Sequence, residues 1–247
     1  ELGPTLRKLV TAARFNPSLP YLSFLCINFD APVIKEAASW FLDGVFLNYN
    51  SSYLEQMLEQ LLDEDDSLEI TRFLRAVDVR IDGFRVEKAP EWRGQRVFVK
   101  HEVDGKGYEL RLSEESAGTQ KLMGLASFLL AALERGGTVV VDELDAKLHP
   151  KLLRYVILLF KDPEVNKSGA QLIFSSQDVS TMRNDVFRRD EIWFAARGEG
   201  EASQLWSLAD IHEANGNLVS KNAAFDKQYL SGRYGADPYL TRIEEWD

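Results

Sequence analysis

Cysteine, histidine and long apolar runs are scarce in this sequence, and each scarcity excludes a class of protein. The single cysteine, Cys26, excludes an intramolecular disulfide and fits a reducing compartment, which we expect to be the cytoplasm. The three histidines are scattered, without the pairwise spacing of metal ligands, so no zinc site is predicted. No apolar stretch reaches the roughly 18 residues that a membrane span needs, so no membrane partner is predicted.

Acidic residues outnumber basic ones, 39 Asp and Glu against 29 Lys and Arg, which gives a formal net charge of −10. This balance argues against a protein that binds nucleic-acid phosphates over most of its surface, although a local basic groove remains compatible with it. Four arginines that could bind phosphates alternate with acidic residues, so solvated ion pairs are predicted for them. They are Arg72, Arg75, Arg80 and Arg85.

Residues 1–69 are predicted to form a mainly helical region. Apolar residues recur at helical spacing over 6–13, 35–46 and 53–62. The acidic run at 63–66 is interpreted as a solvated helix end or linker, because adjacent carboxylates on a turn do not make a preorganised metal cage.

Residues 70–112 are predicted to form an antiparallel β layer. Apolar and polar residues alternate over 77–81, and two further strands are expected at 96–103 and 108–112. The last two are joined across residues 104–107, Asp-Gly-Lys-Gly, which is a strong hairpin-turn signal.

From residue 113 onward, helices and strands alternate, which predicts an α/β fold with a parallel sheet. One helix is expected near 119–135, ending at Gly136–Gly137, and another near 150–160. Three short buried strands of this sheet are expected at 138–141, 171–174 and 191–196.

Two carboxylates, Asp142 and Glu143, directly follow the apolar strand at 138–141. They are therefore expected at the carboxyl edge of the sheet, where open α/β sheets bind ligands. In nucleotide hydrolases the first of two such acids holds Mg²⁺, and the second polarises the water that attacks the γ-phosphate.

A candidate anion site precedes the helix at 119–135. Ser116, Ala117, Gly118 and Thr119 place a hydroxyl and exposed amides at a helix N-terminus, an arrangement that binds anions. The same residues fit a plain helix cap provided by Ser116 or Thr119, so both interpretations stay open. Residues 144–150 directly follow the two carboxylates and lead into a helix, and a polar set at 175–178 follows the strand at 171–174. Three polar sets at strand or helix ends, in this order, exceed what capping alone explains.

With these motifs in this order, the sequence resembles the ABC-type ATPase heads of the SMC-like and OLD-like families. It is most similar to the AAA-family ATPases of bacterial anti-phage defence, which often sit beside a nuclease partner. Residues 113–121 resemble the signature, 139–150 the Walker B segment and D-loop, and 171–178 the switch strand. Residues 188–194 resemble the strand that follows and 229–236 the C-terminal segment, so the resemblance runs from about Ile70 to Leu240.

The resemblance implies a P-loop NTPase fold of the ABC-head type, with a parallel sheet flanked by helices, an antiparallel β layer and an N-terminal helical region. It implies ATP and Mg²⁺ as cofactors, Asp142 as the residue that supports Mg²⁺, and Glu143 as general base. The segment from Ser116 to Thr119 would contact the γ-phosphate of a nucleotide held by another subunit. Five D-loop residues would communicate across that interface: Asp145, Ala146, Lys147, Leu148 and His149.

Four segments are expected in this head. They are a helical region or arm at 1–69, the β layer at 70–112, the ATPase core at 113–200 and a C-terminal segment at 201–247.

The sequence departs from the family pattern because it lacks Gly-x-x-x-x-Gly-Lys-Ser/Thr. Its Gly105–Lys106 pair lies in the expected hairpin and cannot cradle a triphosphate. Since the family's P-loop follows its first strand, and since this chain begins without an initiator Met, we expect a head whose P-loop lobe lies upstream. A member without a P-loop is the alternative.

A second departure is Gln177, which stands where the family usually has a switch histidine. Glutamine donates a neutral hydrogen bond but cannot carry a proton between groups. We therefore expect Gln177 to take the catalytic switch position with slow turnover and a long-lived ATP-bound dimer.

The predicted function is an ATP-hydrolysing subunit in which two heads, as a dimer or within a larger homo-oligomer, sandwich ATP and Mg²⁺. It would serve as a sensor or regulator in anti-phage defence, with an effector nuclease and DNA as partners. The alternative is a non-catalytic scaffold that docks a nuclease or DNA without turnover.

Overall fold

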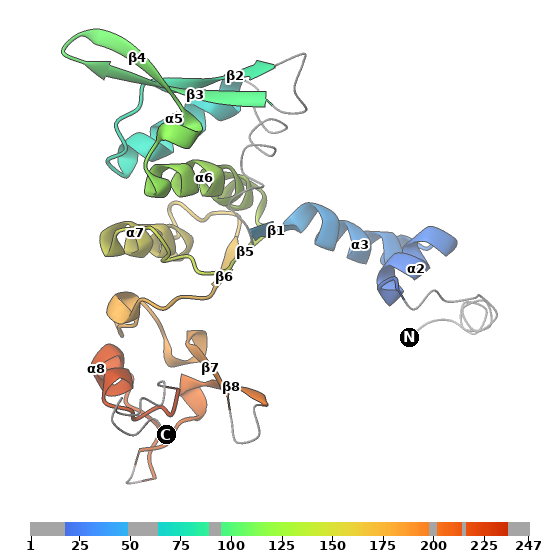
Figure 1. Cartoon of the computed structure of the whole chain (residues 1–247). Helices are drawn as coiled ribbons and strands as arrows, with labels where there is room; N and C mark the ends of the chain where they lie inside the picture. Colours follow the sequence, from blue (N-terminus) through green and yellow to red (C-terminus); the bar gives the residue numbers. More distant parts are fainter. Residues whose placement is uncertain (1–17, 49–63, 89–94, 198–201, 214–215, 237–247) are drawn as a thin grey trace, which may run out of the picture. The chain divides into compact units, whose positions relative to one another are not determined.

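The computed structural model describes residues 18–48, 64–88, 95–197, 202–213 and 216–236 (Figure 1). The chain forms two compact units. The first comprises residues 1–142 and 160–174, and the second comprises residues 143–159 and 175–247. The predicted helices at 6–13 and 53–62 lie outside the described residues.

A three-stranded parallel sheet occupies the first unit. Its strands are β1 (Val45–Asn48), β5 (Thr138–Val141) and β6 (Gln171–Phe174), with β5 in the centre. Helix α6 (Ala117–Arg135) covers one face, where Phe128 packs against Phe46 of β1 with ring centroids 6.0 Å apart. The α/β class with a parallel sheet is confirmed, as are the strands predicted at 138–141 and 171–174.

Helix α6 begins and ends where its sequence dictates. Ser116 is the N-cap, and its hydroxyl accepts a hydrogen bond from the Thr119 amide. Gly136 ends the helix in the left-handed conformation at φ +81°, which a glycine adopts without steric cost. The predicted end at Gly136–Gly137 is therefore confirmed.

An antiparallel sheet of β2 (Gly83–Lys88), β3 (Gln95–Val103) and β4 (Lys106–Arg111) lies in the same unit. Asp104 and Gly105 both have positive φ, +51° and +72°, as a two-residue type I′ hairpin requires. The predicted antiparallel layer is confirmed, and the turn predicted at 104–107 is correct for Asp104 and Gly105, whereas Lys106 and Gly107 belong to β4. Helix α5 (Glu64–Ala76) packs against β2 and α6, and it begins within the acidic run at 63–66.

The strand predicted at 77–81 is wrong. Helix α5 is followed there by a turn in which Asp78 has φ +62° and the Val79 amide donates to the Leu74 carbonyl, 2.9 Å away. Val77 and Ile81 are buried and the residues between them are more exposed, so the alternation reflects burial without strand pairing.

Within residues 18–44, two helices precede β1: α2 (Tyr21–Asn28) and α3 (Pro32–Gly44). The helix predicted at 35–46 is therefore correct up to Gly44, and its last two residues are strand. Val45 and Phe46 belong to β1 because they pair with Thr138 and Val139 of β5. Strand pairing outweighs the helical spacing that Val45 continues.

The second unit contains β7 (Trp193–Arg197), β8 (Ser203–Ser207) and α8 (Phe225–Leu230). β7 pairs antiparallel with β8 in a sheet of its own. The prediction that residues 191–196 join the parallel sheet is therefore wrong. Two strands so close in sequence pair as a hairpin, whereas a parallel partner needs a long crossover. One hydrophobic cluster of this unit consists of Ile192, Phe194, Leu208, Val219, Phe225 and Tyr234.

Helix α7 (Pro150–Lys161) matches the prediction of a helix near 150–160 that begins at a proline. The expectation that residues 171–174 are buried is wrong. Their side chains alternate between exposed and half-buried, because β6 is an outer strand of the described parallel sheet.

Candidate functional site

The predicted carboxylate pair directly follows the central strand of the parallel sheet. Val141, the last residue of β5, lies in register with Phe174, the last residue of β6. Residues that follow the two strands therefore start from the same edge. Asp142 and Glu143 are exposed after β5, as expected from the strand pattern.

The backbone of Glu143 is held in an uncommon conformation. Its φ of +49° is left-handed, which is rare for a residue with a side chain and costs about 1–2 kcal/mol. The Glu143 amide donates to Oγ of Ser175 at 2.7 Å, and the Leu144 amide donates to the Ser175 carbonyl at 3.0 Å. Leu144 is fully buried. These contacts fix the direction in which the Glu143 side chain leaves the loop.

Ser175 is a positioning residue that the sequence did not single out. The only available signal was its place directly after the strand at 171–174, within a polar set. Its pairing with residue 143 spans 32 positions, so no local pattern could reveal it.

The predicted D-loop and the predicted switch residue are joined through Asp145. The Gln177 amide donates to Oδ2 of Asp145 at 3.2 Å. The other oxygen, Oδ1, is buried and accepts no hydrogen bond from any residue within the described ranges. The structure thus joins the carboxylate of Asp145 to the backbone of Gln177. The Gln177 side chain takes no part in this bond.

The D-loop itself is a tight turn that leads into α7. The Ala146 amide donates to the Glu143 carbonyl at 3.0 Å, the Leu148 amide donates to the Asp145 carbonyl at 2.9 Å, and Lys147 has φ +65°. At its end, Nδ1 of His149 accepts a hydrogen bond from the Lys151 amide at 3.1 Å. His149 therefore caps α7, while its role at a subunit interface stays a prediction.

The predicted signature residues form the exposed start of α6. Oγ of Ser116 accepts from the Thr119 amide at 3.1 Å and lies 2.9 Å from Oγ1 of Thr119. Ala117 and Gly118 are the first two residues of the helix. The capping interpretation is therefore correct for Ser116. The positive end of a 19-residue helix also faces outward here, and such ends attract anions.

The chemistry of Asp142 fits a supporting role toward Mg²⁺. Within the described ranges, no three His, Cys, Asp or Glu side chains gather as a metal-binding group. Mg²⁺ at nucleotide sites is usually held by one or two carboxylates together with phosphate oxygens and water. A single exposed carboxylate at a strand end supplies the protein's share of such a site.

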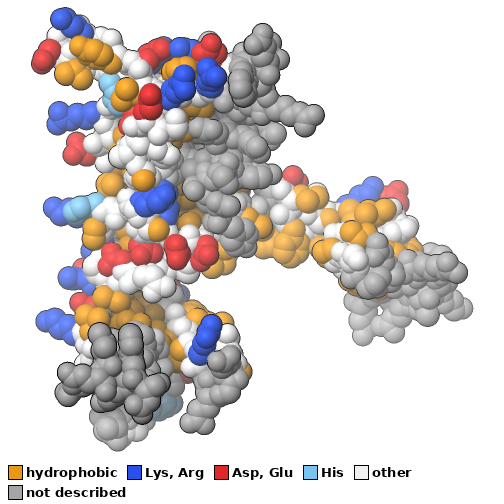
Figure 2. Space-filling view, in the orientation of Figure 1, with side chains coloured by type: hydrophobic (Ala, Val, Ile, Leu, Met, Phe, Trp, Pro, Cys, Tyr) orange, Lys and Arg blue, Asp and Glu red, His pale blue; other side chains and the backbone are white. Residues whose placement is uncertain are grey.

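Three of the four arginines predicted to form ion pairs, Arg75, Arg80 and Arg85, pair with carboxylates, whereas no such pair holds Arg72 within the described ranges. Arg75 pairs with Asp82 at 2.7 Å, and Arg85 pairs with Glu109 at 2.9 Å. The hydrogen bond from Arg85 holds the pKa of Glu109 below its ordinary value. The Arg85 guanidinium also lies 4.2 Å from the centre of the Phe98 ring. Figure 2 shows side chains of both signs side by side over β2–β4, so this surface is an ion-pair network.

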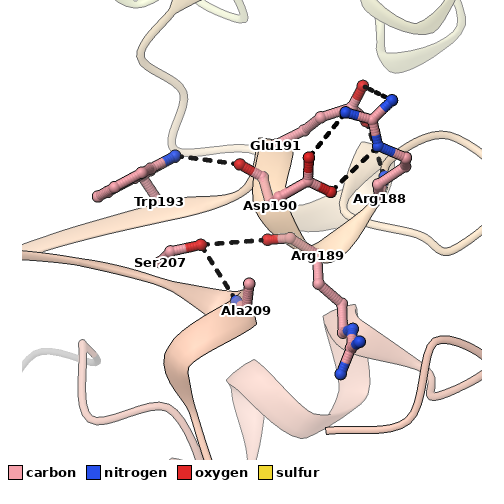
Figure 3. Close-up of polar contacts among 7 residues, drawn as sticks. All are labelled: Arg188, Arg189, Asp190, Glu191, Trp193, Ser207 and Ala209. Atoms are coloured by element: carbon pink, nitrogen blue, oxygen red, sulfur yellow. Dashed lines mark hydrogen bonds and ion pairs between the residues drawn. The ribbon is translucent and has the colours of Figure 1, made fainter. Parts of the chain in front are cut away.

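In the second unit, the segment predicted to follow the switch strand is tied by its own charges. Arg188 pairs with Asp190 at 2.7 Å, and the Arg188 amide donates to the Glu191 carboxylate at 2.7 Å (Figure 3). The Trp193 indole donates to the Asp190 carbonyl at 3.2 Å. These bonds shape the turn that starts β7, so we assign them to the fold.

The helices of the described residues include none long and apolar enough to cross a membrane.

No curated protein matches the chain. Among solved structures, one from work entitled "Structural biochemistry of ATP-driven dimerization and DNA stimulated activation of SMC ATPases" matches 64% of this chain and 89% of its own, at 16% identity and a TM-score of 0.42. Another, "Crystal structure of the SmcHead bound to the C-winged helix domain of ScpA", matches 62% of this chain and 43% of its own, at 16% identity and a TM-score of 0.37.

The model of the family described as "AAA domain, putative AbiEii toxin, Type IV TA system" matches residues 14–183. This range includes the candidate signature, both carboxylates, the D-loop and the end of β6. Because the match covers more than half of the sequence, the chain belongs to this family of AAA domains.

Proposed function

We propose that this chain is a catalytic part of an ATP-hydrolysing head, in which two heads enclose ATP and Mg²⁺ between them. The observation that carries the proposal is the carboxylate pair after β5, with the Glu143 backbone held in a left-handed conformation by Ser175. Strain of this kind collects at functional sites, where surrounding contacts over-determine it. The membership in an AAA-domain family supports a general ATPase role.

In the proposed reaction Glu143 is the general base, and it accepts a proton from the water that attacks the γ-phosphate. Asp142 helps to hold Mg²⁺, which would neutralise charge on the phosphate oxygens when bound. Gln177 donates a neutral hydrogen bond toward the γ-phosphate and, unlike a histidine, takes no proton. Slow turnover and a persistent ATP-bound pair of heads follow from this assignment.

The signature acts in trans in this proposal. Ser116, Gly118 and their neighbours Ala117 and Thr119 approach the γ-phosphate bound to the opposite head. The outward-facing N-terminus of α6 and the Ser116 hydroxyl provide the anion-binding groups. The D-loop, from Asp145 to His149, would sense the state of the opposite site through the bond from the Gln177 amide to Asp145.

The wider setting is also a proposal and rests on the sequence resemblance. We propose an OLD-like cytoplasmic regulator of anti-phage defence that controls an effector nuclease and responds to DNA. The four-segment division at 1–69, 70–112, 113–200 and 201–247 is kept as a proposal as well.

The test is ATP hydrolysis by the complete head, including the P-loop that residues 1–247 lack, and by its Glu143→Gln variant. We expect the variant to lose hydrolysis and to retain ATP in a stable dimer, because its amide cannot accept the proton from water. Glu134→Gln, which neutralises an exposed carboxylate at the other end of α6, is the matched control and should hydrolyse ATP at the normal rate. Equal, unmeasurable hydrolysis in all three proteins would favour the scaffold alternative.

A mixing experiment tests the trans arrangement. Ser116→Arg blocks the signature, and Glu143→Gln removes the base, so each variant alone should be inactive. In a mixed dimer, one site combines an intact Glu143 with an intact Ser116 from the other subunit. Random pairing of equal amounts should therefore restore about a quarter of the normal activity, since half the dimers are mixed and each has one intact site. No restored activity would argue against a shared site.

A further inference from the structure

A histidine of the β layer contacts Glu115, which precedes the four candidate nucleotide-contacting residues of the signature, 116–119. His101 lies in β3, and its Nε2 is 2.6 Å from Oε1 of Glu115. The two side chains are only 21% and 10% exposed. Neither residue belongs to the carboxylate, D-loop or switch groups.

Both ring nitrogens of His101 face oxygen acceptors. Nδ1 lies 3.0 Å from the carbonyl oxygen of Arg80, and Nε2 faces the Glu115 carboxylate. A carbonyl can only accept a hydrogen bond, and an ionised carboxylate can only accept as well. The ring thus lies between the backbone of Arg80 and the side chain of Glu115, and a proton carried by Nε2 is donated to the Glu115 carboxylate.

Glu115 is also held through its backbone. Its amide donates to the Leu112 carbonyl at 3.1 Å, and its carbonyl accepts from Nε2 of Gln120 at 2.8 Å. The Gln120 amide in turn donates to the carbonyl of Ser116 at 2.9 Å. Residues 116–119 thus lie between Glu115 and Gln120, which are hydrogen-bonded to each other. Glu115 is in turn bonded to His101 of β3.

We propose that His101 is a positioning residue for the signature segment. It fixes Glu115, and through Glu115 the cap of α6, so that the N-terminus of the helix presents its amides in one arrangement. The antiparallel layer is thereby coupled to the nucleotide contact made in trans. This inference rests on the proposed function for its catalytic consequence, whereas the positioning itself can be measured without nucleotide.

The first test is amide hydrogen exchange by NMR in the absence of nucleotide. His101→Leu and Glu115→Leu should each speed exchange at the Thr119 and Gln120 amides by about tenfold or more, because a hydrogen bond to a charged group is lost. Glu115→Gln should stay close to the original protein, because its amide can donate to an unprotonated Nε2. If Glu115 acted only through packing, leucine would be tolerated as well as glutamine.

Glu109→Leu is the matched control for the leucine variants. Glu109 lies on β4 next to Tyr108, which is paired with His101, so it points to the other face of the same sheet. There it pairs with Arg85. Its loss should leave exchange at the start of α6 unchanged. If His101→Leu does not fold, the comparison of Glu115→Gln with Glu115→Leu still decides the question.

The second test is ATP hydrolysis. His101→Leu should lower kcat about tenfold or more with little change in KM, because the signature completes the site after ATP has bound. Mixing it with Glu143→Gln should raise activity above either variant alone, as a defect acting through the signature in trans requires. Normal exchange and normal kcat in His101→Leu would overturn the inference.

The two proposals fail in distinguishable ways. If Ser116→Arg and Glu143→Gln do not complement each other, the shared ATP site is wrong, and the exchange data still report on positioning. If they do complement each other while His101→Leu behaves like the original protein, the ATP site stands and His101 has no positioning role.

Discussion

Asp145 provides the sharpest prediction about stability, because its two carboxylate oxygens have different surroundings. Oδ2 accepts a hydrogen bond from the Gln177 amide at 3.2 Å. Oδ1 is buried and accepts none from the residues that the structure describes. A buried charged acceptor without a partner is destabilising. We predict that Asp145→Asn makes the chain more stable.

The magnitude follows from the two oxygens. An unsatisfied buried group costs about 1–3 kcal/mol, and more when it is charged. Asparagine keeps an oxygen for the Gln177 amide and removes the charge, although its NH₂ group also lacks an acceptor at the buried position. The bond to the Gln177 amide weakens by about 0.5–1 kcal/mol when the charge is lost. The expected net gain is about 1 kcal/mol in the free energy of unfolding, or roughly 2–4 °C in melting temperature.

The assay is urea unfolding at neutral pH, followed by circular dichroism, with the midpoint compared at an unchanged m-value. Asp178→Asn is the matched control. Both oxygens of Asp178 accept hydrogen bonds from Ser180, at 2.7 Å from its amide and 2.8 Å from its hydroxyl. This control should therefore gain nothing. A loss of 1 kcal/mol or more in Asp145→Asn would refute the reasoning and would mean that the charge of Asp145 is compensated in solution.

Three further predictions concern other sites. Gly136→Ala should destabilise the chain by about 2 kcal/mol or more, because position 136 has φ +81° and a Cβ there would lie 2.4 Å from the Ser168 carbonyl oxygen. Urea unfolding measures this loss, and an unchanged midpoint would contradict the prediction. Burial raises the pKa of Tyr234 to about 12. The contribution of its protonated hydroxyl to the free energy of unfolding is therefore complete below pH 10 and is lost toward pH 12, by at most about 1.4 kcal/mol per pH unit. Tyr234→Phe should remove that slope, and its persistence would assign the slope to other groups. Gln177→His should raise kcat for ATP about tenfold, as a proton-carrying switch residue would, and no increase would end the slow-turnover hypothesis.

Local sequence patterns predicted the elements that carry their own boundary signals. The strand Thr138–Val141 is a fully apolar run that begins after two glycines, and α6 starts at a serine cap. The hairpin at Asp104–Gly105 was equally predictable, because two adjacent positive φ angles favour this residue pair. In each case the deciding residues lie within a few positions of one another.

The remaining features depend on residues that are distant in sequence. Val45 continues the helical spacing of α3, and only its pairing with Thr138 makes it a strand residue. The bonds from the Glu143 amide to Ser175 and from the Gln177 amide to Asp145 each span 32 positions. The contact of His101 with Glu115 depends on the register of β3 against the loop before α6. Such side-chain partners are set by tertiary register, and local periodicity carries no information about them.

The left-handed backbone of Glu143 has a consequence for protein engineering. On conformational grounds alone, glycine is the better residue at position 143 and should gain about 0.5–1 kcal/mol in stability. A redesign that optimised only thermal tolerance would therefore select glycine there and delete the carboxylate that we assign as the general base. Melting temperature and turnover would then change in opposite directions at one position, and libraries built on this chain should hold residue 143 constant.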